Sequence, residues 1–262
     1  MKVLFCNIAW MGEYTGNEDG KDKPLHGGEY VDKTDDAYEK YNFSPMYFNG
    51  EDEAYCLGFY ETKSHNGKDI NQMHIEKILG CELCKNEECV DDVLVIYCAK
   101  HPTYNFTTVV GWYNHADVYR HYQNVEFNGG YVQSYNAIAK AKDCVLLPVG
   151  ERSRKIKWQV PRKANGWKFG FGRANVWYAS EDNEDLKEYM KKLLYQIENY
   201  DGTMTTYSPH KNNMLDMYQI GFNTNTNLAI HGGNDKTTFY ASMSYKHAES
   251  TTPNNTFERY SF

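Results

Sequence analysis

The sequence predicts an α+β fold, in which a mixed β-sheet with peripheral helices precedes a C-terminal antiparallel β-hairpin. Runs of β-branched and aromatic residues over 92–99 and 107–113 are typical of strands. An apolar stripe at helical spacing over 185–200 is typical of an amphipathic helix. After residue 200 the composition shifts to Asn, Thr and Ser, which indicates two units, 1–200 and 201–262.

The first unit opens with an apolar run over 2–8, which predicts a buried strand, and an acidic, glycine-rich loop follows it up to residue 28. Residues 54–62 predict a second strand, whereas the mixed apolar spacing of 71–79 predicts a short helix or turn. We expect the two β-branched runs to be adjacent central strands. The remaining elements follow in order: a short helix over 135–141, strands over 144–148 and 175–178, and a closing helix over 185–200.

Charge is unevenly distributed along the chain. The net charge of −7 argues against a protein that coats nucleic acid indiscriminately, while the 15% of aromatic residues offers surfaces for stacking. One basic strip, residues 152–173, contains no acidic residue and can guide an anionic ligand to one face, although a solvated pair of strands explains it equally well. The strip carries Arg152, Arg154, Lys155, Lys157, Arg162, Lys163, Lys168 and Arg173.

Cysteine usage and the first residues bear on the compartment. All seven cysteines lie at or before Cys144, and their odd number and irregular spacing favour a reducing compartment over a disulfide framework. Residues 1–12 lack the long apolar region and the small-residue cleavage site of a signal peptide, so we expect a cytoplasmic location. No run reaches the ~20 apolar residues that a membrane-spanning helix needs.

The second unit alternates apolar and polar residues over 238–245. A turn is expected at Asn234-Asp235, and one face of the strand that follows carries Phe239, Ala241, Met243 and Tyr245. The segment 232–238, Gly-Gly-Asn-Asp-Lys-Thr-Thr, together with the residues up to 261, closely resembles the early barrel region of SusC/RagA-like TonB-linked outer-membrane transporters. That family imports glycans or peptides with a partner lipoprotein.

The resemblance implies that residues 201–262 are a transporter barrel fragment fused to the first unit. An open piece of two or three strands leaves edge groups unpaired in hydrocarbon, so we expect neither functional membrane insertion nor transport. A fragment of a glycan or peptide importer remains an alternative interpretation of the chain. No partner protein is indicated.

A weaker resemblance concerns the first unit. An acidic turn, Asp91-Asp92, precedes the apolar strand 93–99, and the next strand ends in Val110-Gly111-Trp112-Tyr113. This pattern resembles the central hairpin of PUA-like modules of the EVE and YTH type, which bind a flipped or unpaired modified base in an aromatic cage. The resemblance implies a partly closed PUA-like barrel and non-catalytic recognition of DNA or RNA.

Such a site needs ring faces for stacking and a cationic rim for phosphate. We predict that at least two tryptophans converge on a pocket with cations at its mouth, although tryptophan is also common in cores. The candidate ligand-binding residues are Trp112, Trp158, Trp167, Trp177, Tyr113, Arg120, Arg152, Arg154, Lys157, Arg162 and Lys163.

Two other chemistries remain open. A metal-dependent nuclease would use Asp52 and Glu61 to hold the ion that activates water, with Lys63 beside them. A zinc site would combine three cysteines with flanking histidines, although incidental cysteines in a reduced loop explain the spacing more simply, and we expect no cofactor. The residues of that alternative are Cys81, Cys84, Cys89, His74 and His101.

Overall fold

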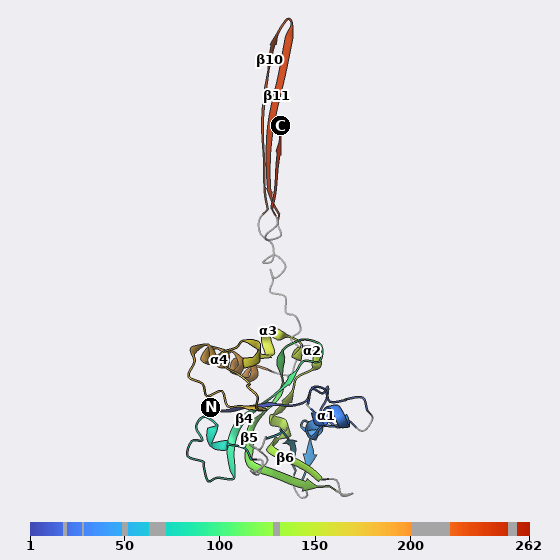
Figure 1. Cartoon of the computed structure of the whole chain (residues 1–262), viewed down its shortest axis with the longest axis vertical. Helices are drawn as coiled ribbons and strands as arrows, with labels where there is room; N and C mark the ends of the chain where they lie inside the picture. The colour runs from blue at the N-terminus through green and yellow to red at the C-terminus, as the bar shows by residue number, and fades with distance from the viewer. Residues whose placement is uncertain are drawn as a thin grey trace. The chain divides into compact units, whose positions relative to one another are not determined.

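The computed structural model describes residues 1–17, 20–27, 29–48, 52–62, 72–127, 132–200, 221–250 and 256–262. The chain divides into two compact units, Met1–Gly202 and Thr203–Phe262 (Figure 1). The first unit is mixed α+β, mostly sheet with few helices, and the second is a three-stranded antiparallel sheet.

Nine strands of the described residues form one open sheet in the first unit, and their path does not close into a barrel (Figure 1). Seven run in the order β2-β3-β6-β5-β4-β1-β9, while β7 and β8 both pair with β5. The strands are β1 Lys2–Asn7, β2 Met46–Tyr47, β3 Ala54–Gly58, β4 Cys89–Lys100, β5 Thr107–Glu126, β6 Val132–Lys140, β7 Cys144–Leu146, β8 Gln159–Val160 and β9 Val176–Trp177.

The helical elements of this unit are short except for the last. The α-helices are α1 Glu29–Thr34, α2 Val149–Arg152, α3 Lys155–Trp158 and α4 Glu184–Glu198. Four 3-10 turns complete the unit: η1 Tyr38–Tyr41, η2 Ile75–Lys77, η3 Ala141–Asp143 and η4 Lys163–Asn165. None of the helices in the described part of the chain is long and apolar enough to cross a membrane.

The predicted central strands are confirmed as β4 and β5, which pair antiparallel with Ile96 opposite Trp112. The strand expected at 2–8 is β1, which lies parallel to β4. The expected strand over 54–62 ends at Gly58, because side-chain amides replace strand pairing at the next two residues. Asn42 bonds to the backbone of Phe59, and Asn136 bonds to that of Tyr60.

The prediction of a helix over 135–141 is wrong, since these residues belong to β6 and the start of η3. The alanines of this run are good helix formers. However, β6 lies between β3 and β5, and pairing on both sides satisfies its backbone while burying Ala137 and Ala139. Tertiary pairing therefore outweighs local propensity here.

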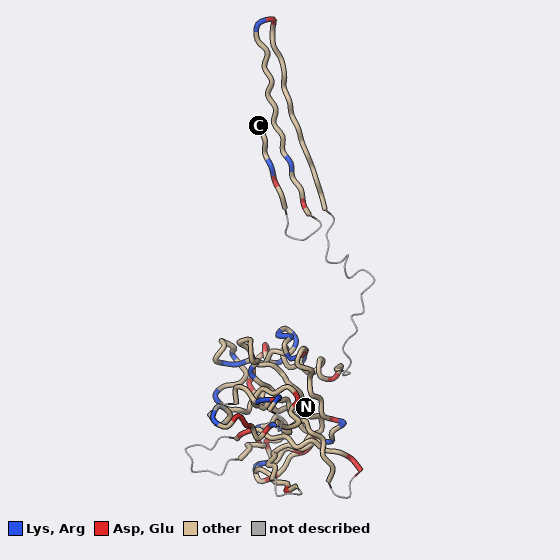
Figure 2. Tube along the Cα trace, turned by 90° about the vertical axis from the view of Figure 1, so that its right-hand side faces the viewer, with Lys and Arg blue, Asp and Glu red and all other residues tan. Residues whose placement is uncertain are grey.

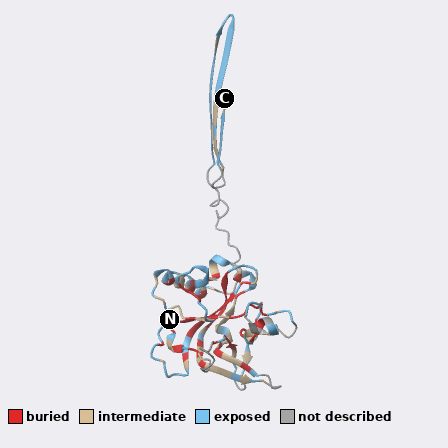
Figure 3. Ribbon diagram, in the orientation of Figure 1, coloured by how far each residue is buried: buried red, intermediate tan, exposed pale blue. Residues whose placement is uncertain are grey.

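The sheet of the first unit has a hydrophobic core on each face, which Figure 3 shows as buried residues along the strands. Because side chains alternate along a strand, Leu4 and Val95 face one core while Phe5 and Ile96 face the other. Helix α4 covers the second face with Leu186, Leu193 and Ile197.

The second unit consists of β10 Phe222–Asn234, β11 Thr237–Glu249 and β12 Thr256–Ser261, paired antiparallel in that order. The expected turn is confirmed, because Asn234 Oδ1 accepts hydrogen bonds from the Lys236 and Thr237 amides, each at 3.0 Å. Strand β10 contains no charged residue, and charges elsewhere in the sheet are few (Figure 2). Phe239 is 57% exposed and Met243 is 49% exposed, so an apolar row stays open.

Candidate functional site

Three of the four candidate tryptophans lie in the core rather than around a pocket. The rings of Trp112 and Trp158 stack at 5.8 Å between centroids, and Tyr200 packs edge-on against both. Trp177 packs on Phe5 at 4.5 Å. All three tryptophans are at most 5% exposed, so their faces already contact protein and the predicted convergence on a pocket does not occur.

The other predicted ring, Tyr113, is also buried, and its hydroxyl donates a hydrogen bond to the Asn42 carbonyl. The reason is common to these rings: inward positions of a sheet covered on both faces are filled by the largest apolar side chains. A β-branched run around Trp112 and Tyr113 was therefore a signal of burial.

Two of the predicted cations have structural roles. Arg152 is fully buried and donates hydrogen bonds to the carbonyls of Leu147, Met11 and Gly12 at 2.6–2.7 Å. Arg120, 8% exposed, donates to Glu76 and to three backbone carbonyls of residues 84–87. Arg152 is enclosed by these carbonyls, whereas Arg120 also borders a groove of about 590 Å³, which His74, Lys85 and His121 line as well.

The remaining predicted cations form ion pairs or hydrogen bonds with residues outside the basic strip. Glu151, just before the strip, pairs with Arg154 at 2.8 Å and with Lys157 at 3.7 Å. Lys163 pairs with Glu181 at 3.3 Å. Arg162 donates to the side chains of Asn7 and Thr107. All four cations therefore have protein partners, and two of these partners, Glu151 and Glu181, are carboxylates.

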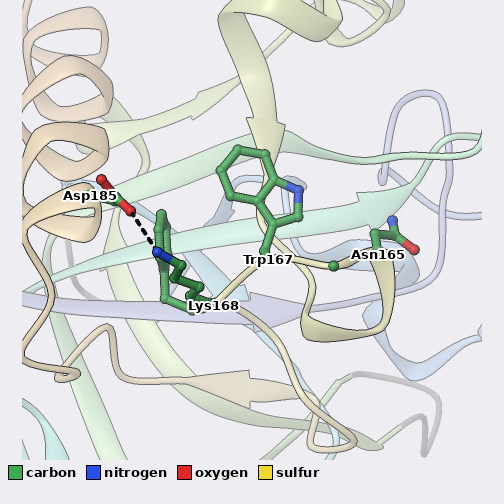
Figure 4. Close-up of a pocket in the computed structure, with 6 residues that line it drawn as sticks. Asn165, Trp167, Lys168 and Asp185 are labelled. Carbon is green, nitrogen blue, oxygen red and sulfur yellow. Dashed lines mark ion pairs between the residues drawn. The ribbon is translucent and has the colours of Figure 1, made fainter.

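Trp167 differs from the other tryptophans, because it is 38% exposed and borders a groove of about 430 Å³ (Figure 4). The groove lies between the segment after η4 and the first turn of α4. It is lined by Asn165, Gly166, Trp167, Lys168, Phe169 and Asp185.

Local geometry holds the Trp167 ring in place. Gly166 ends η4 with φ +84°, a left-handed conformation that glycine adopts without steric cost, and the chain turns there. The Trp167 ring meets the Phe169 ring edge-on at 5.6 Å. Phe169 is 2% exposed and packs against Trp177 and Tyr189. The exposed ring thus rests on a buried aromatic cluster.

Polar groups flank this ring on both sides. Lys168 reaches toward Asp185, with the ammonium 3.8 Å from the carboxylate, and the Asn165 amide lies on the other side of the indole (Figure 4). Glu181 accepts a hydrogen bond from the Trp177 indole at 2.9 Å and also pairs with Lys163, which ties the predicted cation to the cluster beneath the groove.

The zinc alternative lacks a ligand set. Within the described ranges no three His, Cys, Asp or Glu side chains are grouped so as to hold a metal ion. The His101 ring uses Nδ1 to accept from two backbone amides and lies with Nε2 3.0 Å from Ser153. Burial raises the pKa of Cys81, and it raises the pKa of Cys89 to about 11, so both thiols stay protonated near neutral pH.

The structure describes two of the three residues of the nuclease alternative. Asp52 and Glu61 are exposed, the Glu61 carboxylate accepts from Asn175 at 3.1 Å, and Lys63 lies outside the described residues. A carboxyl that the sequence did not single out, Glu39, accepts from the Ala9 amide at 2.7 Å. Burial and, less strongly, the charge of Glu61 raise the pKa of Glu39.

The groove at Trp167 combines what a base-binding site needs: one exposed ring face, an amide, an ammonium group and a carboxylate. Its lining residues include no nucleophile paired with a general base. Comparison of the chain with protein-family models, with curated proteins and with solved structures gave no match.

Proposed function

We propose that the first unit is a non-catalytic recognition domain that binds an unpaired base of DNA or RNA at the Trp167 groove. The observation that carries the proposal is the exposed indole of Trp167, held by the buried Phe169 beneath it. A rigid ring loses little conformational freedom when a base stacks on it. The Asn165 amide and the Asp185 carboxylate are placed at the rim, where base edges present donors and acceptors.

Stacking rather than phosphate attraction dominates in this proposal. A stacked base contributes ~1–3 kcal/mol for each aromatic side chain. Phosphate contacts release counterions and make affinity steeply dependent on salt. Because Lys168 and Lys163 each face a carboxylate, the groove offers little free positive charge, and the salt dependence should be shallow.

Kinship with PUA-like base-binding modules is part of the same proposal. It is supported by the β4–β5 hairpin at the centre of the sheet, the feature on which the resemblance rests. A modified base is the ligand that this kinship favours. In the second unit we propose a transporter-derived segment without transport activity, supported by the uncharged β10 and its alternating partner β11.

Fluorescence titration tests the base-binding proposal. Trp167 is the most exposed of the five tryptophans, so a stacked base should quench the emission of the full chain. The ligands are short single-stranded DNA and RNA oligonucleotides, each with and without one methylated base, at low and high salt. Trp167→Ala should weaken binding about 5- to 150-fold, the equivalent of the stacking energy.

Trp167→Phe is the matched control, because it keeps a ring and should retain most of the affinity. Lys157→Ala should change little, since Lys157 already faces Glu151. Absence of quenching with every oligonucleotide, or unchanged affinity in Trp167→Ala, would contradict the proposal.

A further inference from the structure

A second cavity, of about 300 Å³, opens beside the β5–β6 pair. Its lining residues are Tyr41, Ser44, Pro45, Met46, Phe127 and Gln133. Because none of these side chains carries a charge, the cavity suits a neutral ligand. Its volume lies at the lower end of the roughly 300–1,000 Å³ typical of small-molecule sites, so it fits one heterocycle rather than a polymer.

Gln133 is the unusual residue of this cavity. It lies on β6 opposite Val125 of β5, and it is only 6% exposed. Its side-chain amide has no hydrogen-bond partner in the part of the chain that the structure describes. Its amide atoms are not among the fully enclosed polar atoms that lack a partner in the described residues, so the amide is open to the cavity that Gln133 lines. An unused donor and acceptor at a cavity wall is therefore what a ligand would satisfy.

The segment that contributes Tyr41 and Ser44 to the cavity wall is held by hydrogen bonds. Next to Tyr41, the buried Asn42 accepts a hydrogen bond from the Phe59 amide at 2.8 Å and donates one to the Phe59 carbonyl at 2.9 Å. The Tyr113 hydroxyl donates to the Asn42 carbonyl. These bonds anchor the segment that carries Tyr41 and Ser44, so the cavity does not have to form on binding.

We propose that this cavity binds an adenine base, with the Gln133 amide pairing to its edge. A glutamine amide offers one donor and one acceptor side by side, which matches the exocyclic amine and N7 of adenine. Guanine presents two acceptors on the same edge and leaves the amide oxygen unpaired. The rings of Tyr41 and Phe127 supply the apolar walls. The site is separate from the Trp167 groove, and the proposal does not rest on the function proposed there.

Calorimetric titration of the full chain tests the proposal without any variant. The probes are adenosine, guanosine and N6,N6-dimethyladenosine, which lacks the exocyclic N–H groups. Adenosine should bind about 5- to 150-fold more tightly than either of the others. No detectable binding of adenosine, or equal affinity for adenosine and its dimethyl analogue, would overturn it.

Gln133→Leu removes the donor and the acceptor while filling similar space, and it should reduce adenosine affinity to that of the dimethyl analogue. Thermal unfolding checks that this variant is folded. Trp167→Ala should bind adenosine normally, and Gln133→Leu should still be quenched by an oligothymidylate, so failures of the two sites are distinguishable. Wild-type adenosine affinity in Gln133→Leu would refute the assignment.

Discussion

At the scale of single residues, the basic side chains show how burial decides function. Arg152 belongs to the basic strip, yet it lies fully buried at the end of helix α2, bonded to the segment after β1. Its guanidinium donates hydrogen bonds to three backbone carbonyls, and these carbonyls accept no other hydrogen bond among those described. It also lies over the ring of Trp10 at 5.4 Å. Arg152 therefore links two distant segments of the first unit.

Arg152→Ala should lower the free energy of unfolding by at least about 3 kcal/mol, because each buried carbonyl left unpaired costs roughly 1–3 kcal/mol. Arg152→Lys should recover only part of this loss, since one ammonium cannot reproduce the planar fork. Urea denaturation measures both. Arg154→Ala is the control, with an expected loss below about 1 kcal/mol because the Arg154 side chain is 58% exposed and Glu151 keeps Lys157 as a partner. Equal losses in the two alanine variants would refute the structural role.

Glu39 should make stability depend on pH. Its pKa is raised above the ordinary value of 4.5, first by burial, so the folded state binds the proton more tightly than the unfolded state. The free energy of unfolding should therefore fall as pH rises from 4.5 through the folded pKa and level off above it. Glu39→Gln keeps an acceptor for the Ala9 amide without the charge, and denaturation across pH should show no such fall. Parallel pH profiles of the two proteins would contradict this.

At the scale of elements, α4 has a defined start and an unambiguous buried face. The Asn183 side chain accepts hydrogen bonds from the Asp185 and Leu186 amides at 2.8 and 3.3 Å, which caps the helix. Leu193 and Ile197 then pack into the core on the second face of the sheet. Because Asp185 also lines the Trp167 groove, the cap positions one wall of the candidate site.

Asn183→Ala should destabilise the first unit by about 1 kcal/mol, the usual cost of losing a helix cap. Asn183→Asp keeps an acceptor and adds a charge that the helix dipole favours, so it should be close to wild type. Chemical denaturation separates the two, and wild-type stability in Asn183→Ala would show that the cap contributes nothing.

At the scale of the whole molecule, the two units differ in how their apolar residues are covered. The first unit buries apolar side chains on both faces of its sheet, whereas the three strands of the second leave Phe239, Met243 and Phe257 about half exposed. A sheet of this kind gains little from burial, and small antiparallel sheets are marginal on their own.

A chain truncated after Gly202 should keep a cooperative thermal transition, because both cores and the Tyr200 ring that packs on Trp112 remain. The expected change is below about 1 kcal/mol, or a shift in Tm of less than roughly 4 °C. Differential scanning calorimetry of the truncated and full chains measures it. Loss of the transition would show that the first unit depends on residues 203–262.

The sequence by itself determined the features that local pattern controls. The β-branched runs marked β4 and β5, the apolar stripe marked α4, and the change of composition after residue 200 marked where the closing helix ends. Each signal lies within one continuous segment, so its physical cause, side-chain periodicity or chain composition, can be read without knowing the neighbours. The turn at Asn234 could also be predicted, because its hydrogen bonds join Asn234 to residues only two and three positions along the chain.

Only the tertiary structure decided whether each candidate side chain is buried or exposed. It made 132–140 a strand through pairing with β3 and β5, placed Trp112 and Trp158 in the core, and left Trp167 open. It also brought Glu151 and Glu181 next to cations of the basic strip. In addition, it buried Gln133, whose side-chain amide has no hydrogen-bond partner among the described residues. Burial and partner choice depend on segments far apart in sequence, and no local pattern carries that information.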